Sequence, residues 1–330
     1  MNKSCIIGIG HHVPDNIIPN SYFENFMETS DQWIKDRTGI EERRFANKGE
    51  GPSDLAIPAV EMALKNAKLN VEDIDFIIFA TSTPDYYIPG SGCLIQHKMK
   101  FPNIGVLDIR SACTGFIYAL SIADQYIKNR TYNNVLVIAS EVQSTAMDLT
   151  NTGRDTAVIF ADGAAAAILS ISNNEHGILS THLHTEGEYA KQLWVEAPSS
   201  QQKPRLNQQI LDNGKHFLKM NGKEVFRHAV KRFPEVIIEG LNHNNLKVSD
   251  INLLIPHQAN FRISKMVQKK LELDDCQVIS NIHKYGNTTA ASIPIALSEA
   301  LNDNKLNKGD ILVLAAFGSG FSWASAILKW

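Results

Sequence analysis

Three residues of this chain have side chains suited to nucleophilic and hydrogen-bonding chemistry: Cys113, His257 and Asn287. Cys113 follows the short apolar run 105–109 and precedes apolar residues at helical spacing, which predicts a strand-to-helix turn around the cysteine. The free N–H groups and dipole of a helix N-terminus stabilise the thiolate, which is the reactive form of cysteine. The structural alternative is a small buried hydrophobic residue, the usual role of a free cysteine.

His257 and Asn287 also stand at predicted strand ends or turns. His257 comes soon after the apolar run 253–255, and Asn287 follows a glycine in a turn before a helical pattern. Ligands of α/β sheets bind at such positions. A neutral imidazole and an amide each offer N–H donors that can stabilise negative charge on an oxygen atom. Taken singly, a histidine after a strand is more often structural, and an asparagine after glycine is usually a turn residue.

An internal repeat organises the elements that carry these residues. NVEDIDFIIFAT at 70–81 matches KVSDINLLIPHQ at 247–258 with an offset of 177, and NVLVIASE at 134–141 matches DILVLAAFG at 310–318 with an offset of 176. Two matches at nearly one offset predict duplicated halves. The repeat also places Asn287 roughly where Cys113 stands in the first half.

The order of elements predicts an α/β fold. Each half alternates helical patterns with apolar strands, so helices should cover the faces of a sheet. Continuous apolar strands at 76–79 and 253–255 indicate burial on both faces. The segment 187–219 is rich in Gln, Asn, Lys and Pro, and is expected to form an insertion or lid, or else a plain surface loop.

The composition suits a globular enzyme: 330 residues, 44% hydrophobic and 20% charged. A net charge of −3 gives no reason to expect nucleic-acid binding. The N-terminus lacks a signal-peptide pattern, and no run approaches the roughly 18 apolar residues of a membrane span, so we expect a cytoplasmic chain with no membrane partner. The four cysteines show no metal-ligand spacing, and we predict no metal site.

Three segments resemble β-ketoacyl-acyl-carrier-protein synthase III, a family of condensing enzymes with the thiolase fold. They are DIRSACTGFIYAL at 108–120, IPHQANFRI at 255–263 and KYGNTTAASIP at 284–294. The segments 31–46, 151–165 and 316–330 extend the resemblance over almost the whole chain. The resemblance implies two pseudo-symmetric βαβαβαββ halves, residues 1–172 and 173–330, in a layered α-β-α-β-α core.

The resemblance also implies an acyltransferase. Cys113 would take the acyl group of an acyl-CoA, and His257 and Asn287 would assist decarboxylation of malonyl-acyl carrier protein, whose enolate then attacks the acyl-cysteine. Backbone N–H groups of Cys113 and Ser319 would form the oxyanion hole. Ser319 stands where many relatives carry glycine, so a positive φ there would strain it. No cofactor is implied beyond CoA as part of the substrate.

Other functions stay open at this point. A thiolase-fold relative of specialised metabolism could join two acyl-CoA molecules or use unusual acyl donors. A cysteine acyl-thioester hydrolase would share the cysteine and histidine but needs a positioned water. A non-catalytic acyl-binding subunit is a third alternative, against which Cys113 argues.

By resemblance, four residues would bind CoA. Trp33 and Arg154 would sandwich the adenine, while Arg37 and Thr38 would lie along the nucleotide and phosphates. Guanidinium and indole groups both stack on bases, and arginine pairs well with phosphate. Asp155 departs from the small residue common in the family and would oppose a nucleotide phosphate.

Basic residues follow His257 on a predicted helix and would suit an acidic acyl carrier protein. A solvated helix face is the structural alternative. These residues are Arg262, Lys265, Lys269 and Lys270.

The stretch 86–90 matches the region that reaches into the neighbouring subunit in this family, which implies a homodimer. Ile88 would then shape the acyl pocket, and Phe317 is placed at the same pocket. His182 and His184 could lie on one face of a strand as metal ligands, but no third ligand is apparent. We therefore expect them to be strand surface residues.

Overall fold

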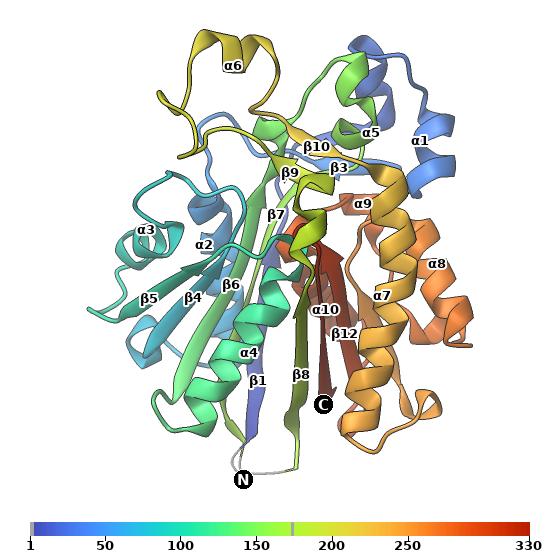
Figure 1. The fold of residues 1–330 in the computed structure, drawn as a ribbon. Coiled ribbons are helices and arrows are strands. Elements are labelled where there is room, and N and C mark those ends of the chain that lie inside the picture. Colours follow the sequence, from blue (N-terminus) through green and yellow to red (C-terminus); the bar gives the residue numbers. More distant parts are fainter. Residues whose placement is uncertain (1–2, 173–174) are drawn as a thin grey trace.

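Two β-sheets form the centre of the molecule (Figure 1), which we describe from a computed structural model covering residues 3–172 and 175–330. The first sheet has five strands in the order β1-β7-β6-β4-β5, and the second has four in the order β11-β12-β13-β8. The first comprises β1 (Lys3–His12), β4 (Phe76–Ala80), β5 (Gly105–Ile109), β6 (Asn134–Val142) and β7 (Asp162–Ser172). The second comprises β8 (Gly177–Thr185), β11 (Leu253–Pro256), β12 (Ile311–Gly318) and β13 (Ser322–Lys329).

The two sheets repeat one topology. In the first, β4 runs parallel to β5 and β6, while β7 is antiparallel to β6 and β1. In the second, β12 runs parallel to β11, and β13 is antiparallel to β12 and β8. A parallel bridge between Leu254 and Val278 stands beside β11 where β5 stands beside β4. The predicted boundary between residues 172 and 173 reaches a residue outside the described part of the chain, and stays a prediction.

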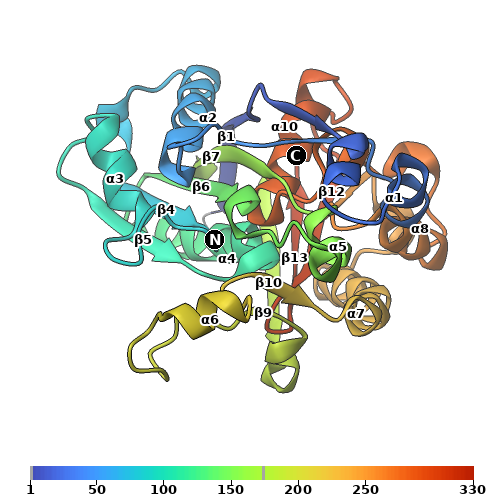
Figure 2. The ribbon, with the colours of Figure 1, turned by 90° about the horizontal axis from the view of Figure 1, so that it is seen from above.

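Helices complete five layers. The outer face of the first sheet packs against α2 (Pro52–Ala67) and α3 (Ser91–Lys98), and that of the second against α7 (Gly222–His243). Between the sheets lie α4 (Gly115–Lys128) and α10 (Ser292–Asn302), which contact strands of both. The central layer buries one continuous apolar cluster that draws on both sheets. Figure 2 shows α2 and α3 on one side of the molecule and α7 on the other.

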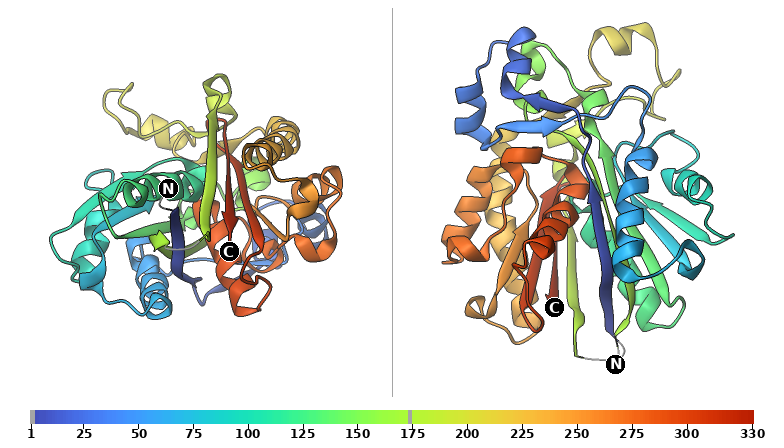
Figure 3. Two further views of the ribbon diagram at one scale, coloured as in Figure 1. Left: turned by 90° about the horizontal axis from the view of Figure 1, so that it is seen from below. Right: turned by 180° about the vertical axis from the view of Figure 1, so that it is seen from behind.

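Helix α8 (Phe261–Lys270) packs beside α7 on the outer side of the second sheet (Figure 1), and the other elements gather at one end of the sheets, as the right view of Figure 3 shows for α1 and α6. Ser30 caps α1 by accepting the N–H of Trp33, and Gly39 ends it with φ +78°, a conformation that favours glycine. The elements at this end are β2 (Ile17–Pro19), α1 (Asp31–Thr38), β3 (Glu42–Arg44), α5 (Arg154–Ala157), β9 (Leu193–Val195), α6 (Gln208–Asp212), β10 (Leu218–Met220) and α9 (Ile282–Tyr285).

Two one-turn 3₁₀ helices repeat in front of the central helices. Residues 112–114 lead into α4 and residues 289–291 lead into α10, and each turn begins with a positive φ, +44° at Ala112 and +52° at Thr289. The offset between these two residues is again 177, so Cys113 corresponds to Ala290. The expected equivalence of Cys113 and Asn287 is therefore wrong by three residues. Among the described helices, none is long and apolar enough to cross a membrane.

Candidate active site

Cys113 lies where two cavities meet. It is 4% exposed and belongs to the turn between β5 and α4, as the sequence predicts. The first cavity, of about 760 Å³, opens toward α1 and α8, and the second, of about 930 Å³, opens toward β9 and α6. Cys113, Phe160 and Leu193 line both cavities. A thiol at this point can be reached by two different groups at once.

The thiol of Cys113 is not activated in the protein alone. Burial, followed by the negative charge of Glu141, raises its pKa to about 12, although the N–H groups of Cys113 and Ser319 act in the opposite direction. The expectation that the helix N-terminus lowers this pKa is therefore wrong as a net effect, because desolvation outweighs it. Deprotonation must accompany the arrival of a reacting group.

The turn after β12 presents donors to the cysteine. The backbone N–H of Ser319 is directed at the Cys113 sulfur, where it would stabilise the thiolate. Ser319 avoids positive φ, and Gly320 takes φ +137° instead, so the strain considered for the serine falls on a glycine. A Cβ on Gly318 would lie 2.7 Å from the Cys113 Cβ and 3.1 Å from its Sγ. This glycine therefore permits the close approach of the turn to the nucleophile.

His257 is held as a neutral hydrogen-bond donor. It is 2% exposed, and burial lowers its pKa to about 3. Its Nδ1 lies 2.6 Å from Ser292 Oγ, which also accepts the backbone N–H of Gln258 at 3.3 Å. Nδ1 is the one acceptor within reach of the Ser292 hydroxyl among the described hydrogen bonds, so we assign the hydroxyl as the donor to Nδ1 and the imidazole proton to Nε2. Nε2 is buried and has no partner among the described residues.

Asn287 is oriented by a neighbouring peptide group. Its Oδ1 accepts the N–H of Thr289 at 2.8 Å, which assigns the other amide position to Nδ2. Its backbone is fixed by bonds to Ile159 and Ala161, both 2.9 Å long. Asn287 lines the first cavity together with Cys113 and His257. The structure thus brings the three residues together, with two N–H donors available to a bound oxygen.

Glu141 is a buried acid that sequence reasoning missed. It is fully buried at the end of β6 and accepts the N–H of Ser82 at 3.1 Å and the hydroxyl of Thr83 at 2.8 Å. Burial raises its pKa to about 7. The available signal was a single acidic residue that ends the otherwise uncharged strand sequence NVLVIASE. Ser292, in the segment NTTAAS, was missed because its role depends on a contact with a distant strand end.

The residues expected to bind adenine already contact each other. The guanidinium Cζ atoms of Arg37 and Arg154 each lie 4.6 Å from the centroid of the Trp33 ring. Arg154 also donates to the carbonyl of Glu28 at 3.0 Å. An adenine sandwiched by Trp33 and Arg154 would have to displace this guanidinium, because 4.6 Å is already a direct stacking contact.

The other residues predicted to bind CoA differ in whether their side chains are already engaged within the protein. Trp33, Arg37 and Asp155 line the first cavity. Thr38 also lines it but is 3% exposed, and its hydroxyl donates to Ile34 O at 2.6 Å and accepts the N–H of Ile40. This hydroxyl serves the end of α1, which leaves mainly van der Waals contact for a ligand. Sequence reasoning missed Lys223, a further cation on the same cavity.

The basic residues of α8 are not equivalent. Arg262 lines the first cavity, whereas Lys265 is paired with Asp275 at 2.5 Å. Lys269 lies in the last turn of the helix. The N-cap of α8, Asn260, donates to the carbonyl of Arg37 at 2.9 Å and so joins α8 to α1 at the cavity mouth.

Phe317 and Ile88 lie apart. Phe317 is 3% exposed and lines the first cavity beside Cys113, not the second. Ile88 is 79% exposed and lines neither cavity, while its neighbour Tyr87 lines the second. A role for Ile88 in an acyl pocket therefore depends on a second subunit and stays a prediction.

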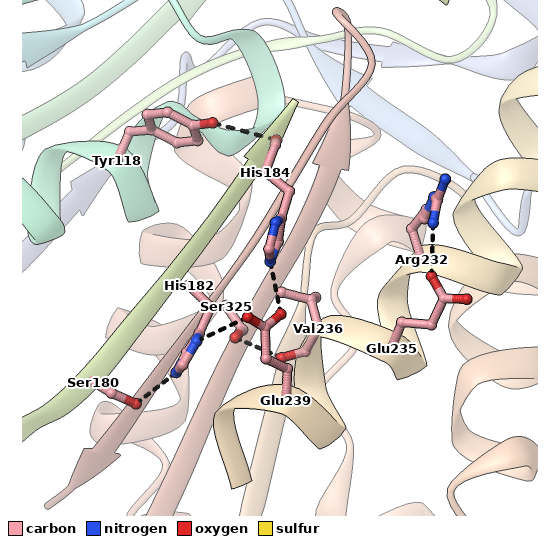
Figure 4. Close-up of polar contacts among 9 residues, drawn as sticks. All are labelled: Tyr118, Ser180, His182, His184, Arg232, Glu235, Val236, Glu239 and Ser325. Atoms are coloured by element: carbon pink, nitrogen blue, oxygen red, sulfur yellow. Dashed lines mark hydrogen bonds and ion pairs between the residues drawn. The ribbon is translucent and has the colours of Figure 1, made fainter. Parts of the chain in front are cut away.

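His182 and His184 share one carboxylate (Figure 4). Both point from β8 toward Glu239 of α7, with His182 Nδ1 at 3.3 Å and His184 Nε2 at 2.7 Å from its oxygens. His182 also contacts Ser180 Oγ at 3.0 Å. In the described part of the chain, no group of three or more His, Cys, Asp or Glu side chains could hold a metal ion. The two histidines fasten β8 to α7.

Comparisons with known proteins agree with this arrangement. Family models for 3-oxoacyl-[acyl-carrier-protein] synthase III match residues 107–187, and for its C-terminal part residues 241–330. The β-ketoacyl-[acyl-carrier-protein] synthase III of Clostridioides difficile is 44% identical over 328 residues, 99% of this chain and 98% of that protein. The enzyme of the same name from Fusobacterium nucleatum is 41% identical, covering 100% of this chain and 99% of its own.

A solved structure points to the same family. The crystal structure of 3-oxoacyl-[acyl-carrier-protein] synthase III from Aquifex aeolicus superposes with a TM-score of 0.91 at 39% identity, covering 99% of this chain and 100% of that one. This likeness confirms the thiolase-like α/β fold predicted from the sequence. The chain belongs to the β-ketoacyl-[acyl-carrier-protein] synthase III family of condensing acyltransferases.

Proposed function

We propose that the chain condenses an acyl-CoA with malonyl-acyl carrier protein, with loss of carbon dioxide, through an acyl-Cys113 intermediate. The observation that carries the proposal is the shared cavity, which brings Cys113 together with Asn287 Nδ2 and with His257 Nε2, a buried atom that has no partner among the described residues. A buried nucleophile beside two neutral donors suits a reaction in which negative charge develops on a thioester oxygen. CoA enters as part of the substrate, and no separate cofactor takes part.

In the first stage, Cys113 Sγ attacks the thioester carbonyl of acyl-CoA. The carbonyl oxygen becomes an oxyanion that the N–H groups of Cys113 and Ser319 stabilise. When the C–S bond to CoA breaks, the CoA sulfur leaves as a thiol, carrying the proton that the cysteine loses. The products are free CoA and an acyl-cysteine thioester, so that one difficult step becomes two easier ones.

In the second stage, the malonyl carboxylate leaves as carbon dioxide. The electron pair of the broken C–C bond passes into an enolate, whose oxygen accepts hydrogen bonds from His257 Nε2 and Asn287 Nδ2. The enolate carbon attacks the acyl-cysteine carbonyl, and Cys113 leaves and takes up one proton. Neither donor has to change its charge during the step, because the imidazole is already neutral.

Intact-protein mass spectrometry after exposure to acyl-CoAs from acetyl to long-chain tests the first stage. We expect a mass gain that peptide mapping places on Cys113 and that Cys113→Ala abolishes. His257→Ala and Asn287→Ala should acylate normally and condense poorly. Normal condensation by Asn287→Ala would refute this division of roles.

The products formed from the same acyl-CoAs, with and without a malonyl donor, separate the alternative functions. Rapid acyl-CoA hydrolysis without any malonyl donor would indicate a hydrolase. Condensation with malonyl-CoA as readily as with malonyl-acyl carrier protein would indicate an enzyme that joins two CoA thioesters. Labelling by acyl carrier protein thioesters but by no CoA would keep the fold and change the donor.

Docking of the acidic carrier protein is assigned to the cavity mouth. Arg262 and Lys223 line the first cavity there, and Lys269 extends the positive surface along α8. Charge reversal in Arg262→Glu should raise KM for malonyl-acyl carrier protein several-fold, and this KM should depend less on salt concentration than in wild type. The rate of acylation by acyl-CoA should change little. Equal effects on both substrates would place the role of Arg262 on CoA instead.

We also propose a homodimer that places Ile88 in the partner's second cavity. Strand β5 is an edge of the first sheet, and Tyr86, Tyr87 and Ile88 are 59%, 53% and 79% exposed. An exposed edge and apolar patch suit pairing with a second copy. Sedimentation of wild type and Ile88→Asp tests this, with a dimer expected only for wild type. We place the reaction in the cytoplasm, where a reactive thiol stays reduced.

A further inference from the structure

Ser319 touches two parts of the molecule through two different groups. Its backbone N–H points at the Cys113 sulfur, and its side-chain hydroxyl donates to the carbonyl of Leu193 at 2.5 Å. Leu193 begins β9, inside the segment 187–219 whose role the sequence left open. One residue thus connects the candidate oxyanion hole with this segment.

The carbonyl of Leu193 depends on that hydroxyl. The N–H of Asn221 donates to Gln192 at 2.8 Å, so the next residue pair, Leu193 with Met220, falls at a non-hydrogen-bonded position of the antiparallel ladder. The Leu193 carbonyl therefore points away from β10. Leu193 is 6% exposed, so its carbonyl would lose its donor without gaining ready access to water if the hydroxyl were removed, which is unfavourable.

Other contacts fasten the same stretch along the turn. Glu186 and Phe321 exchange two backbone hydrogen bonds of 2.8 and 3.0 Å, and the ring of Tyr189 stacks on Phe321 with centroids 5.4 Å apart. We call residues 318–321 the oxyanion turn. Residues 186–193 thus lie against this turn. The Ser319 hydroxyl supplies the bond at the β9 end of this contact.

The position of β9 shapes both cavities. Leu193 is one of the residues that line both, and Trp194 and Val195 line only the second. Ser319 and Gly320 line the second cavity as well. Any movement of β9 relative to the oxyanion turn therefore changes the wall against which a group on Cys113 would extend.

We propose that Ser319 is a positioning residue. Its hydroxyl holds β9 against the oxyanion turn through the hydrogen bond to Leu193, and so determines which acyl-chain lengths the second cavity accepts. The proposal rests on the proposed acyl transfer through Cys113. A glycine at position 319 would keep the backbone N–H and lose this hydrogen bond. The side chain of Ser319 therefore acts on selectivity, separately from the donor role of its N–H.

The test measures acylation of Cys113 by a series of acyl-CoAs from acetyl to octanoyl, with kcat/KM for each chain length. Ser319→Ala removes the hydroxyl and keeps the N–H. We expect the ratio of long-chain to short-chain kcat/KM to change at least about fivefold, and Ser319→Thr, which restores a hydroxyl, to return it toward wild type. Amide hydrogen exchange of residues 186–197 should rise in Ser319→Ala but not in Ser319→Thr.

The control is Ser325→Ala, since Ser325 Oγ also donates to a distant carbonyl, that of Val236 at 2.8 Å (Figure 4), and Ser325, which is fully buried, lines neither cavity. It should leave the selectivity ratio unchanged. Tyr189→Leu loosens the same contact from the other side, without altering the oxyanion turn, and should shift the ratio in the same direction. This variant keeps the test informative if Ser319→Ala fails to fold.

The outcomes separate the two proposals. If Ser319→Ala lowers kcat/KM by the same factor for every chain length, the ratio stays that of wild type. The hydrogen bond between Ser319 and Leu193 then has no role in selectivity, and the inference is overturned. An unchanged ratio in Tyr189→Leu as well as Ser319→Ala has the same meaning. If wild-type Cys113 accepts no acyl group from any CoA, the proposed function itself fails.

Discussion

Ser292 Oγ lies 2.6 Å from Nδ1 of His257, and this contact determines which imidazole nitrogen faces the cavity as a donor. The serine belongs to the first turn of α10, while the histidine follows β11. The central helix layer thus fixes the tautomer of a residue that the second sheet supplies. Nε2 carries the proton because Nδ1 accepts one.

Ser292→Ala should therefore impair the second stage only. Without the hydroxyl, the Nδ1–H tautomer becomes accessible and the enolate loses a fixed donor, so malonyl decarboxylation should fall by roughly tenfold. Acylation of Cys113 by acyl-CoA should keep its rate, and Ser292→Thr should restore decarboxylation. Equal losses in both stages would show that Ser292 serves the fold rather than the histidine.

Gly318→Ala should abolish acylation. The new Cβ would lie within 3.1 Å of the Cys113 backbone nitrogen and sulfur, so the oxyanion turn has to move away from the nucleophile. Gly187→Ala is the control, since its Cβ meets nothing within 4 Å. The measurement is the rate of acyl-cysteine formation by mass spectrometry, with circular dichroism to check folding. Near-normal acylation by Gly318→Ala would mean that the turn tolerates displacement.

Glu141→Gln should make Cys113 more reactive. Burial is the main cause of the raised thiol pKa, and the charge of Glu141 is the second, so removing that charge lowers the pKa. Alkylation of Cys113 by iodoacetamide between pH 7 and 10 should move to lower pH in the variant. Cys93 and Cys276 are exposed and should be replaced by serine in both proteins. An unchanged profile would place the Glu141 charge too far away to act.

The same variant should change how stability depends on pH. Burial raises the pKa of Glu141 from 4.5 to about 7, so the folded state binds its proton more tightly than the unfolded state. The resulting stability is fully present below pH 4.5 and is lost as pH rises through 7. Relative to Glu141→Gln, wild type should lose about 3 kcal/mol of unfolding free energy between pH 4 and pH 8. Urea unfolding measures both free energies. The same difference in unfolding free energy between wild type and Glu141→Gln at every pH would contradict this prediction.

Trp33→Ala should weaken use of acyl-CoA without harming the chemistry. Trp33 lies on the first cavity with Arg37 stacked on its ring, and its indole is not one of the donors assigned to the second stage. We expect KM for acyl-CoA to rise about tenfold, with little change in KM for the matching acyl-pantetheine, which lacks the nucleotide. A parallel rise for both substrates would assign Trp33 to the fold of α1 instead.

The fold was predictable where the sequence pattern is regular. Apolar strands such as 76–79 and 253–255 and the repeat at offset 177 indicate two α/β halves, and both strands are buried as expected. The small error in equating Asn287 with Cys113 arose from matching the polar residues of the two turns, because the offset of 177 itself leads from Cys113 to Ala290. The positive φ of Ala112 and Thr289, which the sequence does not display, confirms that alignment.

The candidate site was predictable in its residues and less so in its electrostatics. The resemblance pointed to Cys113, His257 and Asn287, which share one cavity. The thiol pKa was predicted in the wrong direction, because the depth of burial and the nearby carboxylate of Glu141 arise from packing between distant segments. The bond between Ser319 and Leu193 joins residues 126 positions apart, and no local pattern announces it.

The repeated turns also constrain how this molecule could change. Ala290 holds the position equivalent to Cys113 and is 1% exposed, with its Cβ packed toward Gly115 at the start of α4. A Cβ added at Gly115 would lie only 3.3 Å from it. A larger side chain at 290 would press on the helix that follows the nucleophile. The two turns therefore share one backbone conformation but differ in the space beside it, so that a thiol at 290 would crowd the start of α4 instead of entering a cavity.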